Sequence, residues 1–265
     1  MPIELEADIQ CPTADEFAAL AYDVMACTFA VHNEIGRFCD EKIYKRLVAK
    51  RFGGVQLEVP VTVTFDNFRK QYFLDMLVRG QALFEWKAIE RLAPEHRGQL
   101  LNYLLLCDLP KGKLVNVRPE LVEHEFVNTT LRPSDRREFS IDVEHFQPLD
   151  SADTTWQQFL TSALRDWGTG LDLHLYEAAI AHVFGGEEVV LKDISMVVNT
   201  EAIGQQKARL TSSGATFKVT ALYENESLFE QHARRFLEHT TLPAIHWVNV
   251  TRKCVSFRTL KRQED

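Results

Sequence analysis

No stretch of this 265-residue sequence approaches the roughly 20 consecutive apolar residues that span a bilayer, so we expect no membrane segment. Residues 1–10 also lack the basic and apolar regions of a signal peptide, and we expect a cytoplasmic protein. The cysteines are odd in number and form no Cys-x-x-Cys pair, which favours reduced thiols over disulfides. Their spacings also match no iron–sulfur pattern: Cys11, Cys27, Cys39, Cys107 and Cys254.

Long basic segments are absent as well. The chain carries 30 Lys and Arg against 38 Asp and Glu, a net charge of −8, and both halves share the excess of acid. Proteins that rely on non-specific phosphate attraction usually have a positive face, so the composition disfavours a general polyanion binder. One predicted helix does gather five basic residues, for which a solvated helix face is the simpler interpretation: Lys42, Lys45, Arg46, Lys50 and Arg51.

Two apolar runs, residues 72–78 and 82–88, read as strands joined by a tight turn at Arg79-Gly80. Side chains two apart on a strand point to one face, so a hairpin gathers Asp75, Glu85 and Lys87 on one rim. Two carboxylates suit a hard divalent cation, and a neighbouring lysine can hold a water or offset charge. The alternative is a hairpin edge whose charges face water.

A helix is predicted next, from Pro94, at its first position, to Leu106. Its apolar stripe faces the core, whereas Gln99 and Tyr103 are four apart and share a second face. A helix packed across the hairpin could aim both side chains at the rim that holds the charged residues.

The chain resembles the PD-(D/E)XK nuclease superfamily over residues 16–127, through an Asp, then Glu-x-Lys, then Gln-x-x-x-Tyr. Its local sequence is similar to that of the GxxExxY-type members of the superfamily. The resemblance implies a restriction-endonuclease-like fold and Mg²⁺ or Mn²⁺ as cofactor. It assigns metal ligation to Asp75, Glu85, the Trp86 carbonyl and Glu41. It assigns activation of the water to Lys87. It also counts Gln99 and Tyr103 among the catalytic residues, where they position the nucleic-acid strand or the loop that bears Glu85.

The GxxExxY helix also supplies candidates for substrate binding, which are Tyr44, Lys42 and Lys45. For Tyr44 a core position is the alternative. The chain departs from the family pattern at two positions. Phe38 stands where the family has glycine, and Leu74 stands where the superfamily has proline.

The second half repeats the first with a shift of 132–133 residues. The run from Tyr44 to Gly54 corresponds to the run from Tyr176 to Gly186, and 114–117 corresponds to 247–250. At a shift of 133 each residue proposed for the hairpin and its helix is replaced: Asp75 by Ala208, Glu85 by Lys218, Lys87 by Thr220, Gln99 by His232 and Tyr103 by Phe236. The repeat therefore keeps the core residues and lacks the proposed site residues. The alternative is that the likeness is a chance match between α/β segments.

We therefore expect an α/β protein with two tandem restriction-endonuclease-like domains, each a mixed central sheet flanked by helices. Residues 1–128 form the nuclease-like domain, 129–153 a connector with one short strand near 137–143, and 154–265 the degenerate repeat. The expected activity is Mg²⁺-assisted hydrolysis of DNA phosphodiester bonds, with the two halves as an intramolecular pseudo-dimer. The alternatives are a catalytically silent nucleic-acid-binding or scaffold protein, and a hydrolase acting on RNA or a small phosphate compound.

Overall fold

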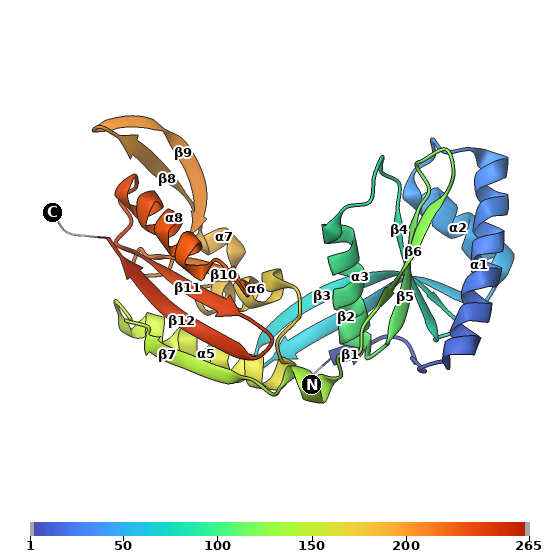
Figure 1. Cartoon of the computed structure of the whole chain (residues 1–265), viewed down its shortest axis with the longest axis horizontal. Coiled ribbons are helices and arrows are strands. Elements are labelled where there is room, and N and C mark those ends of the chain that lie inside the picture. Colours follow the sequence, from blue (N-terminus) through green and yellow to red (C-terminus); the bar gives the residue numbers. More distant parts are fainter. Residues whose placement is uncertain (1–2, 263–265) are drawn as a thin grey trace. The chain divides into compact units, whose positions relative to one another are not determined.

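The computed structural model describes residues 3–262, and the chain divides into two compact units, Met1–Pro133 (unit 1) and Ser134–Asp265 (unit 2) (Figure 1). Within the described residues, no helix combines the length and apolar character that a membrane crossing needs.

Unit 1 is built on a six-stranded sheet in the order β1-β2-β3-β4-β5-β6. β4 and β5 run parallel, and the other neighbouring pairs are antiparallel, as predicted for a mixed sheet. The strands are β1 (Ile3–Leu5), β2 (Val55–Phe65), β3 (Phe68–Val78), β4 (Ala82–Lys87), β5 (Lys111–Asn116) and β6 (Glu123–Asn128).

Two helices, α1 (Ala14–Ile35) and α2 (Glu41–Phe52), cover one face of this sheet, and α3 (Pro94–Cys107) covers the other (Figure 1). Thr13 caps α1 in a capping box with Glu16, as its type and position predict. The buried stripes of α1 and α2 pack on Met76, Phe84 and Trp86. On the opposite face, a Cβ at Gly112 would meet the Leu100 and Leu104 side chains at 3.0 and 3.1 Å, so glycine lets α3 lie close to β5.

Unit 2 contains a four-stranded sheet in the order β10-β11-β12-β7 and a separate hairpin of β8 and β9. β10 runs parallel to β11, β11 antiparallel to β12, and β12 parallel to β7. The strands are β7 (Ser140–His145), β8 (Leu191–Val198), β9 (Glu201–Arg209), β10 (Thr216–Thr220), β11 (Ala244–Val250) and β12 (Cys254–Lys261). The helices of this part are α4 (Pro133–Arg136), α5 (Ser151–Trp167), α6 (Leu173–Val183), α7 (Glu187–Val190) and α8 (Glu226–Glu238).

The strands predicted at 72–78 and 82–88 and the helix predicted from Pro94 to Leu106 are confirmed as β3, β4 and α3, with shifts of a few residues at their ends. The short strand predicted near 137–143, within the expected connector 129–153, corresponds to β7. β7 lies within that range, yet Ser140 pairs with Cys254 inside the sheet of unit 2. Composition and periodicity do not show which strand β7 joins, because its partner β12 lies more than a hundred residues further along the chain.

Candidate metal centre

Asp75 lies where the pairing of β3 is interrupted on both sides. The ladder between β3 and β4 runs from Val78↔Ala82 to Met76↔Phe84, and beyond it the Asp75 Oδ2 accepts the backbone N–H of Trp86 at 2.7 Å. On the other side Glu58 has a left-handed backbone (φ 52°) between the pairs Leu57↔Met76 and Val59↔Leu74. Left-handed backbone at a residue with a bulky side chain is uncommon, and it marks a local break in β2. The Asp75 carboxylate thus bonds to the backbone of β4 just beyond the end of the ladder between β3 and β4.

Lys45 of α2 is the cation at the centre of the site. Its Nζ lies 2.8 Å from Asp75 Oδ1, 2.5 Å from Glu58 Oε1 and 3.1 Å from Glu41 Oε1. Only 4% of the residue is exposed. Burial by itself would lower the pKa of this lysine, but the hydrogen bonds with Asp75 and Glu58 raise it above its ordinary value. Lys45 therefore stays charged and draws three carboxylates together.

Glu85 of β4 is fully buried, and its Oε1 accepts a hydrogen bond from Lys87 Nζ at 2.6 Å. Its other oxygen, Oε2, is buried and has no hydrogen-bond partner among the described residues. Burial first, and then the charge of Asp75, raise the pKa of Glu85 to about 8, against the lowering effect of Lys87. Burial and Asp75 raise the pKa of Glu41 in the same way. The charges of Glu41, Asp75 and Glu85 therefore act on one another, as the prediction of a shared rim requires.

These residues fit a divalent cation in their chemistry. Carboxylate oxygens are the preferred ligands of Mg²⁺ and Mn²⁺, and the unsatisfied Glu85 oxygen is a buried acceptor without a donor. Within residues 3–262, no group of three or more Asp, Glu, His or Cys side chains is gathered closely enough to hold a metal ion as it stands. The Lys45 ammonium contacts two of the carboxylates, Glu41 and Asp75.

Gln99 and Tyr103 of α3 lie together, with Gln99 Nε2 donating to the Tyr103 hydroxyl at 3.1 Å. The Tyr103 ring stands edge-on to Tyr72, with centroids 6.2 Å apart, and Tyr72 precedes Asp75 by three residues on β3. These contacts bring the pair to β3. Their action on the substrate or on the Glu85 strand stays a prediction.

Two of the three residues of α2 that were assigned to substrate binding, Tyr44 and Lys45, are buried. Tyr44 is fully buried and donates its hydroxyl hydrogen bond to the Gly36 carbonyl at 2.5 Å, so it belongs to the core and offers no surface to a substrate. Lys45 is no part of a solvated helix face and no free substrate ligand. Lys42 is well exposed, and its proposed contact with substrate stays a prediction.

Glu58 was missed, because nothing in the pattern of β2 distinguishes it from the other polar residues of an alternating strand. A signal for Lys45 did exist. Glu41, Tyr44, Lys45 and Val48 follow the i, i+3, i+4, i+7 spacing of a single helix face, and Tyr44 and Val48 are both fully buried. A lysine on that stripe has to meet carboxylates inside the protein.

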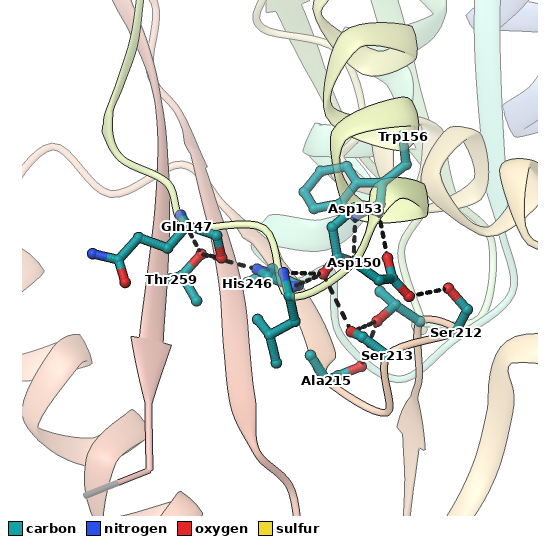
Figure 2. A network of polar contacts seen from close by, with 11 residues as sticks. Gln147, Asp150, Asp153, Trp156, Ser212, Ser213, Ala215, His246 and Thr259 are labelled. Atoms are coloured by element: carbon teal, nitrogen blue, oxygen red, sulfur yellow. Dashed lines mark hydrogen bonds and ion pairs between the residues drawn. The ribbon is translucent and has the colours of Figure 1, made fainter.

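A second polar network lies in unit 2, centred on Asp153 of α5 and His246 of β11 (Figure 2). His246 Nε2 lies 3.0 Å from Asp153 Oδ2, and both side chains are fully buried. Thr259 contacts the other ring nitrogen at 3.1 Å, and Ser213 donates to Asp153 at 3.2 Å. The serine contacts the carboxylate rather than the imidazole, so the order is not that of a nucleophilic triad. The network satisfies buried polar groups.

Comparison with known proteins places the site within a recognised domain. Residues 18–128 match the family model described as PD-(D/E)XK nuclease superfamily. No curated protein matches the chain. Among solved structures, the crystal structure of SSO0001 is 20% identical over 45% of this chain and 61% of that one, with a TM-score of 0.30. The chain thus spans less than two thirds of that protein's length, and a likeness of this size carries no argument. Residues 18–128, which hold Glu41, Asp75, Glu85 and Lys87, form a PD-(D/E)XK nuclease superfamily domain.

Proposed function

We propose that unit 1 is a metal-dependent nuclease that hydrolyses DNA phosphodiester bonds. The observation that carries this proposal is the bond from the Trp86 N–H to Asp75, which brings Asp75 beside Glu85, whose one oxygen contacts Lys87 and whose other oxygen is buried and unsatisfied. Nuclease superfamily membership makes nucleic acid the expected substrate, and this superfamily typically uses a divalent metal.

Asp75, Glu85, Glu41 and the Trp86 carbonyl are the groups that would hold Mg²⁺ or Mn²⁺. When bound, the ion supplies a Lewis acid that polarises the phosphate and lowers the pKa of a water. The chain itself contributes Lys87, whose side chain is 15% exposed and whose ammonium lies 2.6 Å from Glu85. A lysine in that position can donate a hydrogen bond to a water or to a phosphate oxygen. Gln99 and Tyr103 are proposed to position the substrate or the strand that carries Glu85.

We assign the domain to the GxxExxY type, because Glu41 and Tyr44 stand three apart on one helix beside the site. Glu41 contacts Lys45, and its pKa responds to Asp75, which supports a place at the centre for this carboxylate. The family glycine is replaced by Phe38, which is 79% exposed and can be accommodated without disturbing the core.

We further propose that unit 2 is a degenerate copy of the same domain. The sheet registers support this. Glu85↔Leu114 and Lys87↔Asn116 in unit 1 correspond to Lys218↔Trp247 and Thr220↔Asn249 in unit 2, each shifted by 133 residues. Asn116↔Glu123 corresponds to Asn249↔Ser256 with the same shift. Chance matches between α/β segments would not carry strand pairing along with the sequence.

Two buried hydrogen-bond motifs support the copy independently. Tyr176 donates to the Gly168 carbonyl at 2.8 Å, which repeats the bond from Tyr44 to Gly36. Asn249 exchanges hydrogen bonds with the backbone N–H and carbonyl of Leu222, as Asn116 does with Ile89. Since Ala208, Lys218 and Thr220 stand at the positions of Asp75, Glu85 and Lys87, unit 2 is assigned a structural or substrate-binding role.

One observation favours a different function, that of a catalytically silent nucleic-acid-binding or scaffold protein. Lys45 already pairs with two of the carboxylates that a metal ion would use, Glu41 and Asp75, which suits a chain that needs no ion there. In this alternative Lys45 is a permanent structural replacement for the ion.

The test combines metal binding with cleavage. Titration of Mn²⁺ is followed by calorimetry, and duplex DNA, single-stranded DNA and RNA are assayed side by side with Mg²⁺ or Mn²⁺. Asp75→Asn and Glu85→Gln are expected to weaken Mn²⁺ binding and to reduce cleavage at least about 100-fold, since even indirect support of a metal ligand is worth 10- to 100-fold.

Glu125→Gln is the matched control, because it also removes a carboxylate from unit 1 but one that pairs with Arg97 near the surface. Wild-type protein that binds no Mn²⁺ and cleaves none of the three substrates supports the silent alternative. Cleavage of RNA alone would retain the enzyme and replace its substrate.

A further inference from the structure

An apolar groove of about 370 Å³ lies in unit 1 between α1 and the strands β5 and β6, away from the carboxylates. Its walls include Tyr22, Met25 and Phe29 of α1, and its sheet side consists of Lys113, His124 and Phe126. Tyr22 is 76% exposed and Phe126 is 52% exposed. β6 is the last strand of its sheet, so its outer edge bears no neighbouring strand among the described residues.

The corresponding place in unit 2 is filled by the chain itself. There β7 runs parallel to β12 and covers its outer edge, from Ser140↔Cys254 to His145↔Arg258. Phe146, directly after β7, packs against Trp156 of α5, His246 of β11 and Phe257 of β12, with ring centroids 5.5, 5.3 and 6.1 Å apart. Phe257 is fully buried as a result.

The positions correspond residue by residue. A shift of 133 relates Lys113 to His246 and His124 to Phe257, and the pair Lys113↔Phe126 to the pair His246↔Thr259. The difference lies in the strand that precedes the first helix. β7 precedes α5 and joins the β12 edge, whereas β1 precedes α1 and pairs with β2 at the opposite edge of its sheet. Unit 1 therefore keeps the receiving groove and edge but uses its own first strand elsewhere.

The polar group at the base of the groove shows what an occupant must carry. Lys113 is 3% exposed, and its ammonium lies 3.7 Å from the centre of the Phe126 ring. Among the described residues no carboxylate pairs with it, whereas its counterpart His246 contacts Asp153. Burial lowers the pKa of Lys113, and burial together with the Lys113 charge lowers the pKa of His124. An occupant with a carboxylate would relieve both effects.

A second copy of this chain does not meet that requirement. Pairing of β6 with β6 would bring another Lys113 and His124 to the same face. The carboxylates of β6 alternate to the other face, where Glu125 pairs with Arg97 of α3 and Glu123 accepts from Asn116. The charges thus favour a different partner.

We propose that this groove binds an extended segment of a partner protein, which adds a strand to the free edge of β6. The segment inserts an aromatic or large aliphatic side chain between α1 and β6, as Phe146 does in unit 2, and offers a carboxylate to Lys113. Strand addition supplies backbone hydrogen bonds, and the groove and the lysine supply the selectivity.

The test uses the full chain and blocked ten-residue peptides of alternating threonine and valine, with phenylalanine and aspartate two positions apart on one face. Binding is measured by calorimetry, and amide hydrogen exchange is followed in β6. The Phe/Asp peptide is expected to bind and to slow exchange at Glu123–Asn128. Replacing its aspartate by asparagine should weaken binding about tenfold, since a charge-assisted hydrogen bond is lost, and replacing its phenylalanine by serine should weaken it further.

Lys113→Met keeps the apolar stem of the side chain and is expected to bind the aspartate and asparagine peptides equally. Lys218→Met, an exposed lysine on β10 of unit 2, is the matched control and should keep the preference for aspartate. Each of four outcomes overturns the proposal. The first two are an absence of peptide binding at millimolar concentration and a preference for aspartate that survives Lys113→Met. The other two are binding of dodecanoate in place of the peptides and self-association through β6, seen in sedimentation.

Discussion

Glu85→Gln is expected to stabilise unit 1 in alkaline solution and to leave it nearly unchanged near pH 4.5. Burial, followed by the charge of Asp75, raises the pKa of Glu85 to about 8 from the ordinary 4.5. Between these values the folded protein holds a proton that the unfolded chain has lost. The free energy of unfolding therefore falls as pH rises through this window, and it reaches its lowest level above pH 8. Glutamine has no proton to lose and avoids the penalty.

The size of the effect follows from the shift. Each pKa unit is worth about 1.4 kcal/mol, so the penalty has an upper bound of roughly 5 kcal/mol, and about 3 kcal/mol is a reasonable expectation. For a unit of this size 1 kcal/mol corresponds to about 3–5 °C, so the transition of the variant at pH 9 should lie on the order of 10 °C above that of the wild type.

Differential scanning calorimetry at pH 5, 7 and 9 measures this difference, and the transition of unit 2 in the same scan is the internal reference. Glu125→Gln should stay within about 0.5 kcal/mol of wild type at each pH, because it alters a surface pair. Adding Mn²⁺ should raise the wild-type transition and leave Glu85→Gln where it was, since only a protein that binds the ion gains from it. A constant difference between Glu85→Gln and wild type from pH 5 to pH 9 would refute the reasoning, because it would mean that Glu85 is hydrated in solution.

Three further outcomes are expected. Lys45→Met leaves three carboxylates without their cation and should lower the free energy of unfolding by about 3–5 kcal/mol in the absence of metal. Mn²⁺ is expected to restore that stability, and an equal loss with and without Mn²⁺ would contradict metal binding there. The hydrogen bond with His246 holds the pKa of Asp153 at about 2 despite burial, so its contribution is present above pH 4 and lost as the pH falls toward 2; acid unfolding of Asp153→Asn should show a flatter dependence in that window. Tyr44→Phe and Tyr176→Phe remove matching hydrogen bonds to glycine carbonyls and should each cost about 1 kcal/mol in chemical denaturation, whereas a large loss from one alone would weaken the case for an internal repeat.

The sequence predicts most helices and strands of unit 1, and it predicts a rim of charged residues whose metal role stays a prediction. The apolar runs 72–78 and 82–88 predict strands, and Pro94 marks a helix start, all of which the structure confirms. Because a hairpin and the twofold period of a strand are local geometry, they bring Asp75, Glu85 and Lys87 together without reference to the rest of the fold. Which strand pairs with which is not settled by such local geometry. That β7 joins β12, and β1 joins β2, depends on contacts between distant segments, which neither composition nor periodicity records.

At the centre of the site, too, some features follow from the sequence and others only from the tertiary structure. The amino-acid sequence determined which carboxylates are placed on one strand face, through the twofold period of the strands. Only the tertiary structure decided that Lys45 lies among them and that Glu58 turns in from β2. A lysine on an amphipathic helix points either to water or to carboxylates within the protein, depending on whether the strands that face the helix carry carboxylates there. That choice is settled by packing between α2, β2 and β3, because a buried ammonium is stable only where carboxylates from other elements converge on it.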